Sequence, residues 1–166
     1  MPLKFTNLFS TRKLSYIKKL KDINECILCE ILKGSENVTR LLVAETELAA
    51  ICVNKFPYNS AHLMIFPKRH IVDYREMSDA EKKEIDILLT KSLDIIDELY
   101  SPCGYNIGYN LGDFSGASIK HIHLHLVPRY KNELGFIDII GGAKIIVEDP
   151  TITMKRLREK FKLELK

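Results

Sequence analysis

The sequence contains no tryptophan and no glutamine, and it lacks any apolar run long enough to cross a bilayer. A membrane-spanning helix needs about 18 or more consecutive apolar residues. The formal net charge of the 166 residues is only +3, and charged residues make up 28% of them. Because that balance is mild, charge alone indicates neither a nucleic-acid partner nor a membrane partner. We therefore expect no nucleic acid and no membrane among the partners.

Acidic residues are missing from the first 21 positions, which carry six lysines and arginines. The segment shares this bias with transit peptides, but a basic arm or helix over residues 1–22, packed on the domain, is the favoured interpretation. No apolar stretch followed by a small-residue cleavage site marks a secretory signal. We expect a cytoplasmic protein, in which cysteines are reduced or bound to metal.

The remaining pattern predicts one domain over residues 1–166, without repeats or low-complexity linkers. Runs rich in apolar and β-branched residues predict four strands, over residues 38–45, 48–54, 62–66 and 105–112. A glycine-containing loop over residues 112–118 and a histidine-rich fifth strand follow. Strands that meet in hairpins, with a helix between them, predict an α+β fold built on an antiparallel sheet.

Two helices are predicted around these strands. Ser78 to Glu81 has the pattern of a capping box and begins a long central helix that ends near Pro102. A C-terminal helix over residues 151–166 follows Asp149-Pro150. Its apolar positions are Met154, Leu157, Phe161 and Leu165.

Three of the five histidines alternate with apolar residues in KHIHLHLVPRY, residues 120–130. In a strand, His121, His123 and His125 would share one face, with neighbours about 6.5–7 Å apart. Burying three imidazoles in register for structure alone would leave several ring nitrogens to satisfy. Two interpretations stay open: the rings bind a metal ion together, or one is a nucleophile and the others orient it and handle protons.

The four cysteines give a second signal. Cys26 and Cys29 have the CxxC spacing that is typical of one half of a zinc site, with a redox pair as the alternative. Cys52 lies in the apolar run AAICV and is expected in the core, whereas Cys103 lies in a turn. A closed zinc site therefore needs two further ligands from the histidines.

HIHLHLV resembles the signature of the histidine-triad (HIT) superfamily of nucleotide hydrolases and transferases, in which histidines alternate with apolar residues. The resemblance extends over most of residues 8–146 and implies a HIT-like fold. VNKFPYNSAHLMIFPKRH (53–70) is similar to the strand–turn–strand that holds the nucleoside, and NLGDFSGASIKHIHLHLVPR (110–129) is similar to the phosphate loop and catalytic strand. CILC (26–29) matches the zinc-containing branches, and FIDIIGGAKII (136–146) resembles a segment of the diadenosine tetraphosphate phosphorylases.

The resemblance implies a role for each histidine. The catalytic group is His121, His123, His125 and His62, in which His123 attacks the α-phosphorus and forms a nucleotidyl-histidine. His125 would lie near the transferred phosphoryl group and help to stabilise its charge and handle its protons. His62 would lie in a second layer around the triad. A structural zinc ion would be held by Cys26, Cys29, His70 and His121.

The resemblance also implies nucleotide contacts. Asn54 corresponds to a residue that binds the ribose hydroxyls, and Asn110 and Ser118 correspond to phosphate contacts. Gly116 would let the backbone approach the phosphate closely. Lys144 is a candidate contact for a polyphosphate tail, with a solvated lysine as the alternative.

The implied activity is cleavage of the α-phosphate anhydride of dinucleoside polyphosphates, with adenine as the base, by a homodimer. Ala117 stands where many hydrolytic members carry glutamine, which favours the phosphorylase-like branch. YKNELGF (130–136) departs from the phosphorylase pattern, so phosphate and water both stay open as acceptors.

Three alternatives remain at this point. The first is a HIT hydrolase of dinucleoside polyphosphates or nucleoside phosphoramidates. The second is a metal-dependent hydrolase with zinc on His121, His123 and His125. The third is a zinc-stabilised nucleotide-binding module that lacks turnover.

Overall fold

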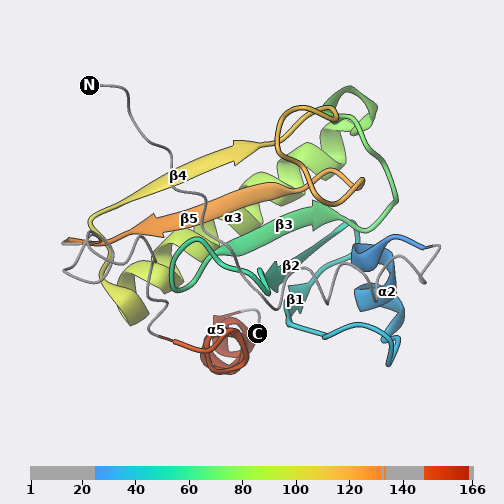
Figure 1. Cartoon of the computed structure of the whole chain (residues 1–166). Helices are drawn as coiled ribbons and strands as arrows, with labels where there is room; N and C mark the ends of the chain where they lie inside the picture. The colour runs from blue at the N-terminus through green and yellow to red at the C-terminus, as the bar shows by residue number, and fades with distance from the viewer. Residues whose placement is uncertain (1–24, 132, 134–147, 165–166) are drawn as a thin grey trace, which may run out of the picture.

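The computed structural model of the chain describes residues 25–131, 133 and 148–164, and an antiparallel sheet of five strands lies at its centre. The strand order is β1-β2-β3-β5-β4 (Figure 1). The expected α+β class and antiparallel sheet are therefore confirmed. The strands are β1 (Leu42–Glu45), β2 (Ala49–Val53), β3 (Leu63–Pro67), β4 (Gly104–Tyr109) and β5 (Leu124–Arg129).

Two helices cover one face of this sheet, α3 (Asp79–Tyr100) and α5 (Pro150–Glu164) (Figure 1). Their apolar residues share one buried cluster with alternate residues of the strands. Burying a large apolar side chain stabilises a fold by about 1.5–3 kcal/mol, so this cluster holds both helices to the sheet. The helix residues in the cluster are Ile85, Leu88, Ile95, Ile96, Met154, Leu157 and Phe161.

Helix α3 begins where the capping box predicts. The Ser78 hydroxyl accepts a hydrogen bond from the Glu81 N–H, and the Glu81 carboxylate accepts one from the Ser78 N–H. The helix ends at Tyr100, and Ser101 takes the left-handed conformation just before Pro102, which cannot continue a helix. In the part of the chain that is described, no helix is both long and apolar enough to pass through a bilayer.

Glu81 is buried and also accepts two hydrogen bonds from the Arg69 guanidinium, at 2.9 and 3.1 Å. These bonds lower the pKa of Glu81 to about 2. A carboxylate with a lowered pKa stabilises the fold above its ordinary pKa of 4.5, and this contribution is lost as the pH falls toward 2.

We expect Glu81→Gln to lower the free energy of unfolding at pH 7 by about 2 kcal/mol, because the charge-assisted bonds are lost. Chemical denaturation at several pH values measures this difference. It should shrink as the pH falls from about 5 toward 2, because the carboxyl of the unfolded chain takes up a proton near pH 4.5 and that of the folded chain only near pH 2. Asp79→Asn, in the same helical turn but fully exposed, should cost about 0.5 kcal/mol or less. A Glu81→Gln cost independent of pH would contradict this account.

Among the described residues, the short helix α2 (Ile27–Lys33) covers part of the opposite face of the sheet. Leu28 and Ile31 of this helix pack with Met64 and Phe66 of β3 in a second buried cluster. Gly34 ends α2 with a left-handed φ of 73° and donates its N–H to the preceding carbonyls. The sequence reasoning placed no helix here. Cys52, which was expected in the core, is buried in the same cluster. Cys103 is exposed.

One expectation about the histidine strand was wrong. Strand β5 begins at Leu124, so only His125 lies within it, and His121 and His123 precede it. The reason is that the ladders to β3 and β4 both end at Leu124, while the Ile122 N–H bonds the Ile71 carbonyl instead. Alternation still continues outside the strand, because Ile122 joins the same core cluster as Leu124.

The other predicted strands are each present but with shifted ends, and the C-terminal helix begins one residue earlier than predicted. The N-terminal arm over residues 1–22, the whole segment 136–146, and Leu165 lie outside the described residues. Asp149 accepts a hydrogen bond from the Thr151 N–H at the start of α5, where Pro150 has no N–H and so needs no acceptor.

Candidate functional site

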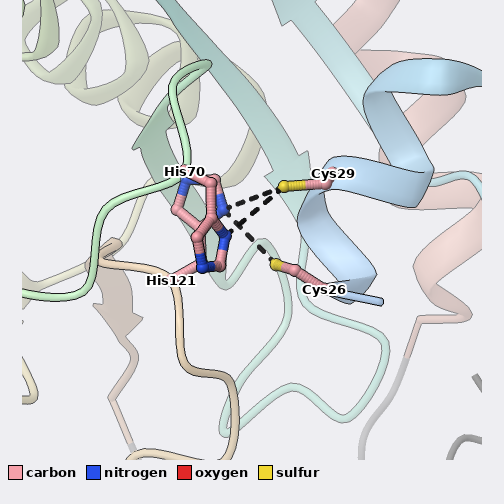
Figure 2. Close-up of side chains that lie close together, drawn as sticks. All are labelled: Cys26, Cys29, His70 and His121. Carbon is pink, nitrogen blue, oxygen red and sulfur yellow. Dashed lines mark hydrogen bonds between the residues drawn. The ribbon is translucent and has the colours of Figure 1, made fainter. Parts of the chain in front are cut away.

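The CxxC motif and two histidines meet at one end of the sheet. Their ligand atoms, one from each of Cys26, Cys29, His70 and His121, all lie within 4.8 Å of one another (Figure 2). Cys26 precedes helix α2 and Cys29 lies in its first turn, so both thiols are carried by one helix. The two histidines come from the loop after β3 and the segment before β5. This is the four-residue group that the resemblance implies.

The contacts within this group have the form of a metal site. The His121 Nδ1 atom lies 3.4 Å from Cys26 Sγ and 3.6 Å from Cys29 Sγ, and His70 Nδ1 lies 3.5 Å from Cys29 Sγ (Figure 2). The other ring nitrogen of His121 donates to the Pro67 carbonyl at 2.9 Å. A metal-binding histidine commonly fixes its ring through such a bond. These four residues could therefore bind a metal ion.

Burial sets the protonation of the ligand atoms. It lowers the pKa of His121 to about 4, so the ring is neutral at pH 7, as a metal ligand must be. Burial, and next the neighbouring Cys26 thiol, raise the pKa of Cys29 to about 11. A metal ion would therefore have to displace the thiol proton in order to bind.

His123 is buried and faces a different set of atoms. Its Nδ1 atom lies 2.7 Å from the His121 carbonyl oxygen. A carbonyl only accepts, so Nδ1 carries the proton in the neutral ring and Nε2 keeps its lone pair. Burial lowers the pKa of His123, which keeps the ring in this neutral form. The arrangement presents an unprotonated ring nitrogen.

His62 and His125 form a hydrogen-bonded pair beside it. The Tyr58 backbone N–H donates to His62 Nδ1 at 3.1 Å, so neutral His62 carries its proton on Nε2. That proton is donated to His125 Nδ1, 2.9 Å away. Neutral His125 must then carry its own proton on Nε2, the nitrogen next to Asn110. The directions of these bonds are set by one backbone donor, and burial lowers the pKa of both rings, to about 3 for His62 and about 4 for His125.

The expected nucleotide contacts meet around these rings. Asn54, Asn110, Gly116 and Ser118 all line one pocket together with His123 and His125. Gly116 has a φ of 86°, which an L side chain rarely adopts, and no atom lies where its side chain would be. Asn110 lies 3.3 Å from His125 Nε2, with its amide oxygen as the matching acceptor once oxygen and nitrogen are exchanged. Lys144 lies outside the described residues.

Four further residues that line the pocket were not predicted from the sequence. Ile27 and Ile31 of α2 line it, and Tyr58 and Phe56 come from the turn between β2 and β3. The Tyr58 ring stacks on His62 with centroids 4.9 Å apart. The stretch CILCEILKG does carry a signal for α2, because a short run of helix-forming residues ends in glycine. Helix α2 therefore contributes both to the candidate metal group and to the lining of the pocket.

The three histidines do not converge on one ion. His121 turns toward the cysteines, whereas His123 and His125 face the pocket, with ring centroids 4.6 Å apart. Among the described residues, the one candidate metal group contains His121 without the other two. The geometry therefore favours a division of labour over the interpretation in which all three rings hold a catalytic metal.

Comparisons with known proteins agree with this site. An AP-4-A phosphorylase of Mycobacterium tuberculosis is 38% identical over 107 residues, which are 64% of this chain and 55% of that protein. An adenosine 5'-monophosphoramidase of Schizosaccharomyces pombe is 30% identical over 110 residues, 66% of this chain and 78% of that protein. The crystal structure of a Zn-bound histidine triad family protein from Mycobacterium smegmatis has the same fold, with a TM-score of 0.68 at 23% identity, and the match covers 85% of this chain and 96% of that one.

The chain spans about half the length of the mycobacterial relatives that it matches. The family model described as the HIT domain matches residues 35–132, more than half of the chain. The matched region contains the pocket residues from Asn54 to His125 and two of the four candidate metal ligands. The chain belongs to the HIT family.

Proposed function

We propose that this protein is an enzyme that cleaves the α-phosphate anhydride of dinucleoside polyphosphates, with adenine as the base, through a nucleotidyl-His123 intermediate. The observation that carries the proposal is the hydrogen bond from His123 Nδ1 to the His121 carbonyl. It leaves the Nε2 lone pair as the nucleophile in the pocket that the nucleotide contacts line.

The first step forms a bond between His123 Nε2 and the α-phosphorus and breaks the bond from that phosphorus to the bridging oxygen. The bridging oxygen leaves with the electron pair as part of a nucleoside polyphosphate. The oxygen leaves as an ionised phosphate, and His125 can donate a hydrogen bond to it from Nε2–H, because His62 holds the His125 proton on that nitrogen. Inorganic phosphate, or water as the less favoured acceptor, then attacks the phosphorus and frees His123.

Phosphate is favoured as the acceptor for two reasons. Ala117 replaces the glutamine of many hydrolytic members, and the M. tuberculosis relative is named an AP-4-A phosphorylase. A hydrolase acting on dinucleoside polyphosphates or nucleoside phosphoramidates is the second candidate. The similarity to the S. pombe monophosphoramidase supports that reading.

The proposed metal is zinc with a structural role. Zinc with Zn–S bonds of about 2.3 Å and Zn–N bonds of about 2.0–2.1 Å in tetrahedral geometry places nitrogen and sulfur about 3.5 Å apart. The three nitrogen–sulfur distances here are 3.4 to 3.6 Å. Four protein ligands leave no open position, so zinc would hold α2 against the segment that leads to His123 and supply no catalytic chemistry.

The proposed enzyme is a homodimer that works in the cytoplasm. The dimer rests on the resemblance to the family alone, and the location rests on the sequence pattern described above. Its proposed partner is a nucleotide, with neither nucleic acid nor a membrane surface as a ligand.

The test is to identify the products from diadenosine tetraphosphate with and without inorganic phosphate. We expect ADP and ATP in the presence of phosphate and little product without it. AMP and ATP without phosphate would instead establish hydrolysis. Tight nucleotide binding without any product over a long incubation would overturn the enzyme proposal and favour a binding module that lacks turnover.

A further inference from the structure

A second groove begins at the triad and follows the face of β4 and β5 away from His123. It is lined by Asn106, Gly108, Val127 and Arg129, and we call it the β4–β5 groove. It shares Tyr58, Asn110, Gly116 and His125 with the nucleotide pocket. The two hollows therefore join at His125.

The order of residues along β5 gives the groove a direction. His125, Val127 and Arg129 alternate along the strand and so share one face, with Gly108 of β4 directly opposite His125 and Asn106 opposite Val127. His123 lies on the other side of His125. A path from His123 past His125 therefore runs into the groove.

In-line displacement needs space for the leaving group on the side of the phosphorus opposite the nucleophile. The attacking and leaving atoms lie on opposite sides of the phosphorus in phosphoryl transfer. With His123 as the nucleophile, the leaving group must depart on the side away from His123, which is the side of His125 and the groove. A nucleotide whose α-phosphate lies at the junction would extend its leaving half along β4 and β5.

Gly108 leaves room for the leaving half of the nucleotide. Its backbone does not have the positive φ that requires glycine, and a side chain added there would meet no atom within 4 Å. Neither backbone geometry nor packing therefore explains a glycine in the middle of a strand. Glycine inside a strand often marks a place where a ligand approaches the backbone. Here it keeps open the floor of the groove next to His125.

Arg129 supplies a cation at the far end. Its side chain is half exposed and bonds Glu133 through Nε and Nη2, and Asn106 Oδ1 through Nη1 at 3.2 Å. These bonds use three of the five N–H groups of a guanidinium, so donors remain for an anion. The Glu133 carboxylate orients the head but also opposes an incoming negative charge, so Arg129 can assist a phosphate chain without forming a strong anion site alone.

We propose that the β4–β5 groove binds the leaving half of the substrate, a nucleoside polyphosphate chain that passes over Gly108 and ends near Arg129. This assignment rests on the proposed function, because the direction of departure follows from His123 as the nucleophile. It makes Gly108 and Arg129 determinants of substrate length, with no part in binding the nucleotide that is transferred.

Equilibrium binding separates the two halves. AMP fills only the nucleotide pocket, whereas an analogue of diadenosine tetraphosphate with methylene groups at both α,β bridges, which resists cleavage from either end, extends into the groove. We expect Gly108→Val to weaken binding of the analogue at least about tenfold, with AMP binding within about twofold of wild type. Arg129→Gln should weaken the analogue by about threefold to tenfold and leave AMP unaffected.

The matched control is Gly104→Val, the same change in the same strand at a glycine that also has open space around it, does not line the groove and lies opposite Arg129 at its far end. It should bind AMP like wild type and weaken the analogue less than Gly108→Val does, and thermal unfolding checks that each variant is folded. Equal effects of Gly108→Val on both ligands, or no effect on either, would overturn the groove assignment. Failure of the wild-type protein to bind either nucleotide would instead refute the proposed function.

Discussion

Replacing His123 with alanine is expected to lower kcat/KM for diadenosine tetraphosphate by about 10⁴-fold or more, a loss of roughly 5 kcal/mol in transition-state stabilisation. The reason is that the ring nitrogen itself forms the bond to phosphorus. In the described pocket, the neighbouring ring of His125 does not direct a lone pair at the same place. His125 presents a proton where His123 presents a lone pair. Steady-state kinetics with phosphate present measure the loss.

His125→Ala is the matched control, because it removes a ring from the same pocket but leaves the nucleophile. Loss of one hydrogen-bond donor to a developing negative charge costs about 10²–10³-fold, so this variant should retain more activity than His123→Ala. AMP binding and the unfolding temperature of both variants check that the pocket is intact. With substrate labelled at the α-phosphorus, wild-type protein should hold an acid-labile label that His123→Ala lacks. If His123→Ala kept a tenth of the wild-type activity, the covalent mechanism would be refuted.

The sequence was most informative where one local interaction decides the structure. The capping box at Ser78 and Glu81 fixed the start of α3 because both reciprocal bonds lie within four residues. Helical spacing of apolar residues such as Ile85, Leu88 and Ile96 likewise indicates which side of α3 is buried. The start of β5 could not be predicted in this way, since it depends on where two partner strands stop pairing, and Ile122 bonds Ile71 instead.

The site shows the same division between local and distant information. The histidine pattern indicated which rings belong to the candidate site, but the position of each proton depends on atoms outside that pattern, such as the Tyr58 N–H that bonds His62. The role proposed for Gly108 could not be predicted from the sequence, because a glycine in a strand has several explanations until its neighbours are known. Helix α2 was missed because seven residues give too few turns for a periodic pattern.

The shared use of α2 leads to the second large expected effect. Removing the metal, or replacing Cys29 with serine, should lower the unfolding temperature by on the order of 10 °C, since metal binding adds its free energy to folding and the chain is of ordinary domain size. Helix α2 also carries Ile27 and Ile31 into the nucleotide pocket. AMP affinity should therefore fall together with stability, which calorimetry on metal-loaded and chelator-treated protein can measure.

Cys103→Ser is the matched control, because it removes an exposed thiol that has no place in the metal group. It should leave zinc content, unfolding temperature and AMP affinity at wild-type values, and chelator should still destabilise it. Cys29→Ser should no longer respond to chelator. The opposite pattern, in which chelation abolishes turnover without changing unfolding or AMP affinity and zinc restores it in Cys29→Ser, would place a catalytic ion on the histidines instead. A metal that only holds α2 in place must act on stability and nucleotide binding together, and it can affect turnover only through them.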